Sequence, residues 1–235
     1  MIYVITVESA KAPKRFEKIT TKTLRQQVYD QLRRKIITAE ILPGEMVSLR
    51  GLAEEFGVSL MPVREALWQL ETEKVVVIES NKSVHVNTLT PEEMEEALRI
   101  RLVIETMAAE RACDYRPLAA VPRVTKLLEA METNRDNPKK YIIMNNQFHL
   151  AIYSCANSPM LLRVIESIWA RIGPYLIIQA SRGGDLFSTM ECHRGMCEAF
   201  AQRDKKAMRT FLQRDLEEAA RINVPLLESF SEGKP

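Results

Sequence analysis

Apolar side chains recur at helical spacing along most of the chain, and strand-like patterns are confined to one short stretch. The first sustained period follows Thr23 and predicts an amphipathic helix, with apolar positions four residues apart at Leu24, Val28, Leu32 and Ile36. A turn at Pro43 and Gly44 follows this helix. Residues 1–19 have no sustained period and are predicted to form a flexible arm.

Two short helices come next, joined by the tight link FGVS. Ser48 is placed to cap the N-terminus of the first helix, and Gly57 to end it in the left-handed conformation. Ser59 is placed to cap the second helix, which tolerates Pro62 in its first turn and has an apolar stripe at Val63, Ala66, Leu67 and Leu70. Two short helices across such a link predict a helix-turn-helix.

The strand-like stretch follows directly. KVVVIES is a β-branched run and SVHVN alternates apolar and polar positions, so these segments predict a hairpin with its turn at residues 80–82. Three helices and a hairpin make a winged helix-turn-helix. We assign this domain to residues 20–88.

A new helix is predicted after Leu89, because Thr90, Pro91 and Glu93 occupy the N-cap, N1 and N3 positions of a capping box. Helical periods then continue, interrupted at Arg116-Pro117, Asn137-Pro138, Asn157 to Pro159, Gly183-Gly184 and Arg203-Asp204. This pattern predicts about six helices with short links over residues 91–228, packed as an antiparallel bundle. The expected fold class is therefore mostly α: a winged helix-turn-helix domain followed by an all-α antiparallel helical bundle.

Composition agrees with this fold and also indicates the cellular compartment. Eight glycines and 6% aromatic residues argue against a glycine-rich nucleotide-binding fold or a β-sandwich. The opening MIYVITV is too short to span a bilayer and lacks the features of an export signal. The four cysteines form no CxxC pair, as expected for reduced thiols: Cys113, Cys155, Cys192 and Cys197. We therefore expect a cytoplasmic protein with no membrane partner.

Positive charge is concentrated near the N-terminus. The whole chain has a net charge of +2, whereas residues 11–50 contain ten Lys or Arg and four acidic residues. Such an excess indicates a polyanionic partner such as nucleic acid, although a solvated charged face gives a similar pattern.

The run PGEMVSLRGLAEEFGVSLMPVREALWQLETEKVVV resembles the N-terminal domain of the GntR family of bacterial transcription regulators, whose usual form is PG, then LAE, then GVSRTPVREAL. Downstream, RLVIE, NNQFHLAIYSCANSPML and HRGM look like the effector domain (FCD domain) of its FadR-like branch. The resemblance covers roughly residues 20 to 220. It implies a homodimeric, ligand-responsive regulator that binds a two-fold symmetric operator in double-stranded DNA.

DNA contacts are predicted on the helix-turn-helix. Arg50 and Arg64 begin successive helices and match family arginines that contact DNA, where a guanidinium can bind guanine or phosphate. The alternative is that Arg64 pairs with Glu65 or Glu71. The family has arginine and threonine after the serine, whereas this chain has Leu60 and Met61. The remaining predicted contacts are Ser59, Leu60, Met61 and the wing residue Lys82. The two apolar side chains can contact thymine methyl groups, so we expect an unusual operator.

A second site is predicted in the helical part from spacing alone. Asn145 and His149 are four residues apart, so their side chains share one helix face. His193 and Asp215 each lie eleven residues from residue 204, at the predicted turn. Two antiparallel helices leaving that turn rise equally, about 1.5 Å per residue, so these two side chains should lie at one level.

The resemblance gives these four residues a role. In metal-binding members of the branch, an aspartate, a histidine one turn later and two further histidines hold a divalent ion, and the matching positions here are Asn145, His149, His193 and Asp215. Zinc, nickel, manganese or iron would suit two imidazoles, a carboxylate and an amide oxygen. The alternative is that both histidines are hydrogen-bonded pocket residues without a metal and that Asp215 pairs with an arginine such as Arg214.

Arg101 matches a family arginine that points into the same cavity. Together with Asn145, His149 and His193 it forms the predicted effector site, where a small carboxylate would bridge the guanidinium and the metal. Its rival role is an internal ion pair with Glu105. We therefore expect a repressor released by a small organic acid. The alternatives are a metal-dependent enzyme using two histidines and one carboxylate, and a DNA-binding protein without a ligand.

Overall fold

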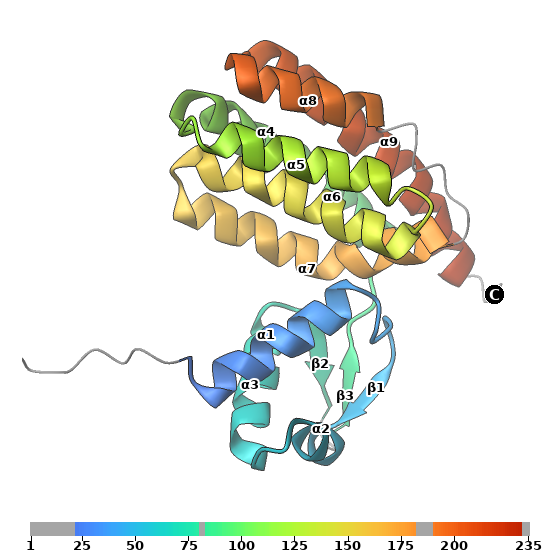
Figure 1. Cartoon of the computed structure of the whole chain (residues 1–235). Helices are drawn as coiled ribbons and strands as arrows, with labels where there is room; N and C mark the ends of the chain where they lie inside the picture. Colours follow the sequence, from blue (N-terminus) through green and yellow to red (C-terminus); the bar gives the residue numbers. More distant parts are fainter. Residues whose placement is uncertain (1–21, 80–82, 182–189, 232–235) are drawn as a thin grey trace, which may run out of the picture.

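The computed structural model describes residues 22–79, 83–181 and 190–231, most of which are helical. Figure 1 shows a small winged unit, from Leu24 to Val86, below a larger helical bundle that runs from Pro91 to Ser231. This is the mostly α fold predicted from the sequence. Within the described residues, no helix is long and apolar enough to cross a membrane.

The elements of the winged unit are α1 (Leu24–Ile37), β1 (Met46–Ser48), α2 (Leu49–Phe56), α3 (Leu60–Thr72), β2 (Val76–Ile78) and β3 (Ser83–Val86). The three helices and the two hairpin strands follow the predicted order. The side chain of Ser48 caps α2 by accepting a hydrogen bond from Gly51 N, and Gly57 ends it in the left-handed region at φ 63°. Ser59 occupies the N-cap position of α3, but its side chain makes no capping hydrogen bond.

The sheet contains one strand that the sequence did not predict. β3 lies in the middle and pairs antiparallel with both β2 and β1, with Val77 opposite His85 and Val47 opposite Val84. The predicted turn at residues 80–82 lies outside the described residues. The predicted apolar stripes of α1 and α3 meet in one core, which includes Val28, Leu32, Ile36, Val63, Ala66, Leu67 and Leu70.

The helical bundle has six α-helices in the part that the structure describes: α4 (Pro91–Tyr115), α5 (Ala120–Thr133), α6 (Pro138–Tyr153), α7 (Pro159–Ser181), α8 (Met190–Gln202) and α9 (Lys205–Ser231), with a short 3-10 turn η1 (Ser154–Ala156) after α6. The predicted capping box is present: Thr90 accepts from Glu93 N while Glu93 accepts from Thr90 N. The predicted break at Gly183-Gly184 lies outside the described residues.

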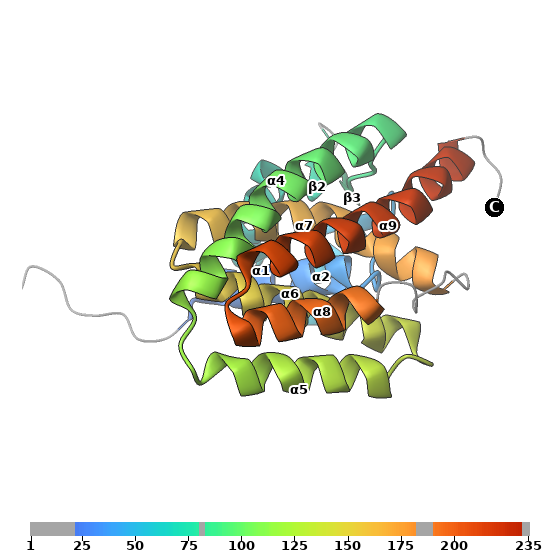
Figure 2. The same cartoon turned by 90° about the horizontal axis from the view of Figure 1, so that it is seen from above.

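Packing in the bundle brings α9 against both α4 and α8, while α5 packs on α6. Figure 2, seen from above, shows α4 and α5 on opposite sides of the bundle with α9 and α8 between them. The turn between α8 and α9 contains Arg203 in the left-handed region at φ 61°, next to Asp204, which caps α9 through Ala207 N. This turn sets the register of the last two helices.

The two units meet along α7. Ala170 of α7 is fully buried and belongs to the core of the winged unit. Arg33 Nη2 of α1 donates to the backbone oxygen of Glu166 at 2.6 Å. Tyr175 Oη accepts from the backbone N–H of Leu89 at 2.8 Å, at the start of α4. Helix α7 is therefore shared by both units.

Candidate functional site

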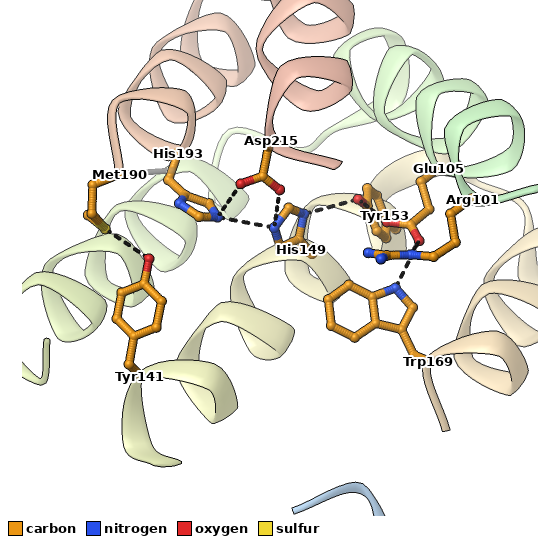
Figure 3. A network of polar contacts seen from close by, with 9 residues as sticks. All are labelled: Arg101, Glu105, Tyr141, His149, Tyr153, Trp169, Met190, His193 and Asp215. Atoms are coloured by element: carbon orange, nitrogen blue, oxygen red, sulfur yellow. Dashed lines mark hydrogen bonds and ion pairs between the residues drawn. The ribbon is translucent and has the colours of Figure 1, made fainter. Parts of the chain in front are cut away.

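Three buried polar side chains from three helices converge inside the bundle. His149 lies on α6, His193 on α8 and Asp215 on α9, with 1%, 1% and 5% of their surfaces exposed. As the equal spacing from the turn predicts, His193 and Asp215 face each other, with Nε2 and Oδ1 3.3 Å apart (Figure 3). Arg214, the arginine named in the alternative as a partner of Asp215, contacts Glu191 and Glu218 instead.

The spacing of the three donor groups matches a coordination polyhedron. His149 Nε2 lies 3.2 Å from His193 Nε2 and 3.4 Å from Asp215 Oδ2. Ligand atoms about 2.1 Å from an ion at tetrahedral angles are about 3.4 Å from one another. The ligating atoms of these three residues all lie within 4.8 Å of one another. Two imidazoles and a carboxylate with this spacing fit a divalent transition metal.

A hydrogen-bond relay fixes the tautomer of His149. Tyr153 Oη donates its single proton to Glu105 Oε2 at 2.7 Å, so its oxygen accepts the 3.0 Å hydrogen bond from His149 Nδ1. His149 therefore carries its proton on Nδ1 and turns the lone pair of Nε2 toward His193 and Asp215. Metal-binding histidines are commonly oriented by this kind of contact on the other ring nitrogen.

Burial controls the protonation of the cluster. The pKa of Asp215 is raised to about 8, mainly because burial desolvates the carboxyl group; Arg101 lowers this pKa, while Glu105 and Glu218 raise it. The pKa of His149 is held well below its usual value by burial, and then by His193 and Arg101. Without a bound cation, the cluster therefore has a neutral His149 and an Asp215 carboxyl group that resists ionisation. A cation bound there would favour the ionised carboxylate.

Asn145 lies one turn before His149 on α6, as predicted, and is half-buried. Its Oδ1 is shielded from solvent and has no hydrogen-bond partner among the described residues. A buried amide oxygen without a donor is costly, so a bound ion or ligand would be a suitable partner. No contact in the described part of the chain joins it to the other three residues.

Arg101 forms the internal pair that was its alternative role, and it also keeps a spare donor. Arg101 Nε lies 2.6 Å from Glu105 Oε1, which also accepts from Trp169 Nε1 at 3.0 Å. The guanidinium carbon lies 4.6 Å from the centroid of the Trp169 ring. Arg101 Nη1 is buried and has no hydrogen-bond partner within the described chain. Figure 3 shows this group next to Tyr153, on the opposite side of His149 from His193.

Sequence reasoning missed two members of this network. Tyr153 and Trp169 link the imidazole of His149 to the guanidinium of Arg101 through Glu105. Tyr153 follows His149 by four residues, the same helical spacing that identified Asn145, so a signal was present. Trp169 lies on another helix and left no such signal.

Five of the six predicted DNA contacts lie on the surface of the winged unit. Arg50, Ser59, Leu60, Met61 and Arg64 are all exposed. Arg64 makes no ion pair with Glu65 or Glu71 among the described residues. Lys82 lies outside the residues that the structure describes. The sequence analysis missed Trp68, which is 54% exposed and one turn beyond Arg64 on the outer face of α3.

Comparisons with known proteins match both parts of the chain. Residues 24–86 match the family described as bacterial regulatory proteins, gntR family, and residues 96–218 match the FCD domain. The chain belongs to the GntR family and carries an FCD domain. GntR regulators bind operator DNA, so this chain is a DNA-binding transcription regulator with an effector-binding FCD domain. All the matched families and relatives are regulators, which disfavours the enzyme hypothesis.

Similar GntR regulators extend over most of the chain. The HTH-type transcriptional regulator McbR of Escherichia coli is 28% identical over 191 residues, covering 80% of this chain and 86% of that protein. The solved structure of E. coli McbR/YncC has a TM-score of 0.80 at 26% identity and covers 90% of this chain and 100% of that one. A gluconate operon transcriptional repressor from Bacillus licheniformis is 32% identical over 148 residues, covering 62% of this chain and 59% of that protein.

Proposed function

We propose that this GntR regulator is a repressor that leaves its operator when a small organic acid binds in the FCD domain beside a divalent metal ion. The observation that carries the proposal is the convergence of His149, His193 and Asp215 next to the spare donor of Arg101. The similarity to gluconate operon repressors supports both repression and an acid as effector. We place the boundary between the DNA-binding and effector domains within residues 88–91, before the capping box of α4.

The metal would be held by His149 Nε2, His193 Nε2 and an oxygen of Asp215, with Asn145 Oδ1 as a further ligand. A divalent ion there would supply positive charge that attracts a carboxylate. Elemental analysis of protein purified without an affinity tag tests this proposal, repeated on His149→Ala. We expect zinc, nickel, manganese or iron in the wild type and none in the variant. Metal absent from both proteins would rule out the metal and leave a hydrogen-bonded pocket.

The effector would place its carboxylate between the metal and Arg101 Nη1, where the guanidinium is already oriented by Glu105 and Trp169. A thermal-shift screen of small carboxylates, sugar acids and amino acids, with and without divalent metals, identifies it. We expect one class of acid to raise the melting temperature only with metal present. If no acid changes the melting temperature or the operator affinity, the protein is a DNA-binding protein without a ligand.

DNA contact is assigned to Arg50, Ser59, Leu60, Met61 and Arg64, with Lys82 on the wing. The test is a titration with a duplex that the protein selects from a random library. Arg64→Ala should lower affinity and reduce the salt slope by about one unit if the contact is to a phosphate. Arg194→Ala, an exposed arginine on α8, is the matched control and should bind like the wild type. Unchanged affinity and slope for Arg64→Ala would disprove this docking.

A homodimer is supported by an apolar stripe on the outer face of α4. Ile100, Val103 and Met107 are 41%, 64% and 48% exposed at successive helical turns. A second copy of the chain would bury this stripe and pair two winged units for a two-fold operator. Analytical ultracentrifugation at micromolar concentration should find a dimer, and Val103→Glu should dissociate it. A monomeric wild type would contradict the proposal.

A further inference from the structure

A second cavity lies outside the histidine cluster, between the winged unit and the helical bundle. Its walls come from α1 and α3 on one side and from α6 and α7 on the other, and its volume is about 740 Å³. In Figure 1, α1 and α7 lie next to each other where the two units meet. Ligand-binding clefts commonly have this size and occur at domain interfaces.

One wall of this interdomain cleft is apolar and is built by both units. Ile37 of α1 faces Ile142, Ile143, Trp169 and Ile177 from α6 and α7 across the cavity. Gly173 of α7 brings the two units into close contact, because a Cβ atom there would lie 3.0 Å from Ile37 Cγ2. Ile142, Trp169 and Ile177 are only 8%, 2% and 5% exposed, so Ile37 and Ile143 present most of the accessible part of this apolar wall.

The charges on the other walls are unequally satisfied. Three of the four lining carboxylates already have donors: Asp30 binds Lys22 at 2.7 Å, Glu40 binds Lys139 at 3.1 Å and Glu73 accepts from Tyr29 at 2.6 Å. Glu166, the fourth, also lines the neighbouring groove over α5 and α6.

Two lining arginines have no such partner. Arg34 and Arg163 are exposed, and their guanidinium groups make no ion pair or hydrogen bond within the described residues. They come from opposite sides of the junction, one from α1 and the other from α7. Within the described residues, the cleft therefore combines the apolar wall with two unpaired guanidinium groups and one unpaired carboxylate, that of Glu166, which leaves an excess of positive charge.

We propose that this interdomain cleft binds an amphipathic organic anion. Its apolar part, about the size of an aromatic ring system, lies on the apolar wall, and its acidic group lies between Arg34 and Arg163. Such a ligand contacts the DNA-binding unit and the FCD domain at once, so it favours one setting of the two units. It also contacts Trp169, whose indole N–H holds Glu105 in the histidine network. By linkage, its affinity changes when operator DNA binds, and by the same factor it changes operator affinity.

Two fluorescent probes with one ring system test the site: anilinonaphthalene sulfonate, which carries the acidic group, and N-phenylnaphthylamine, which lacks it. Ile143→Trp fills the cleft and should weaken both probes by about tenfold or more, since a tenfold loss needs only ~1.4 kcal/mol. The double variant Arg34→Gln with Arg163→Gln should weaken the sulfonate alone. Arg25→Gln is the matched control, an exposed arginine on the opposite face of α1.

The outcomes separate this site from the histidine cluster. Sulfonate affinity that is unchanged in the double arginine variant overturns the proposal, and these exposed substitutions leave the fold intact. Equal binding of both probes by Ile143→Trp and the wild type overturns it as well. His149→Ala should bind both probes normally, while Ile143→Trp should retain its metal content. Failure of the metal site would therefore leave this inference standing.

Discussion

His149 is held through both ring nitrogens, and the two contacts have different consequences. Nδ1 donates to Tyr153, which is itself held by Glu105, whereas Nε2 faces His193 and Asp215. The first contact keeps the ring proton on Nδ1, so Nε2 faces the cluster with its lone pair. The imidazole is thereby preorganised as a metal ligand rather than as a hydrogen-bond donor.

Replacing the tyrosine hydroxyl should therefore weaken metal binding without removing a ligand. Tyr153→Phe is expected to lower zinc affinity by about ten- to a hundred-fold, the usual effect of losing a contact behind a metal-bound histidine. Competition with a chromophoric chelator measures it. Tyr141→Phe is the matched control, because this buried hydroxyl contacts Met190 rather than His149. Equal losses in both variants would mean that the effect is general destabilisation.

The raised pKa of Asp215 predicts proton release on metal binding. Because burial places this pKa at about 8, the carboxyl group is protonated at pH 6, and an incoming cation must displace the proton. Zinc affinity should rise with pH up to about 8 and then level off. In metal-free protein, the free energy of unfolding should fall as pH rises from the ordinary pKa of 3.8 toward 8, because only the folded chain keeps the proton.

Calorimetry at pH 6 in two buffers with different ionisation enthalpies counts the released proton. The pKa of His149 lies well below its usual value, so this residue contributes little at that pH. Asp215→Asn keeps the shape of the side chain and should release one proton fewer. Identical proton release by the variant and the wild type would assign the proton to another group.

At the scale of elements, the cluster depends on how closely α8 approaches α9. Gly195, two residues after His193, lies against the ring of Phe211, one turn before Asp215 on α9. A Cβ atom at Gly195 would lie 2.5 Å from three atoms of that ring, a distance that real Cβ atoms do not tolerate. The missing side chain therefore permits the 3.3 Å contact between His193 and Asp215.

Gly195→Ala should push the two helices apart. We expect it to destabilise the protein by about 1–3 kcal/mol, as overpacking does, and to weaken zinc binding. Thermal unfolding and chelator competition measure the two effects. Adding Phe211→Leu makes room for the new methyl group and should recover most of both losses. Normal metal binding by Gly195→Ala alone would show that the helix spacing does not position the ligands.

Periodicity was sufficient for the helices but not for the sheet or the relay. Repeats at 3.6 residues and local caps such as the Thr90 capping box depend on neighbours in sequence, so the bundle order was predicted correctly. Strand β1 has three residues and mostly exposed side chains, so no alternation identified it. The approach of Trp169 to Glu105 depends on how α7 crosses α4, which no local pattern encodes.

At the scale of the whole molecule, α7 connects the histidine network to the DNA-binding unit. Inside the bundle, Trp169 donates to Glu105 and its ring lies against the guanidinium of Arg101. The next residue, Ala170, is buried in the core of the winged unit. One turn later, Gly173 lies against Ile37 of α1. A shift of α7 on ligand binding therefore moves both surfaces together, which provides a physical route for coupling between effector and operator.

Gly173→Val tests this route because it separates α7 from α1 without touching the histidine cluster or the DNA-contacting residues. In the wild type, zinc with the acid found by thermal shift should change operator affinity by a coupling factor of about 5 to 150. In Gly173→Val we expect that factor to fall toward one while zinc affinity stays normal, measured by anisotropy of a labelled operator duplex. The double variant with Ile37→Ala restores room at the contact and should restore coupling. Because coupling is reciprocal, operator DNA must change ligand affinity by the same reduced factor, and full coupling in Gly173→Val would show that the signal bypasses this contact.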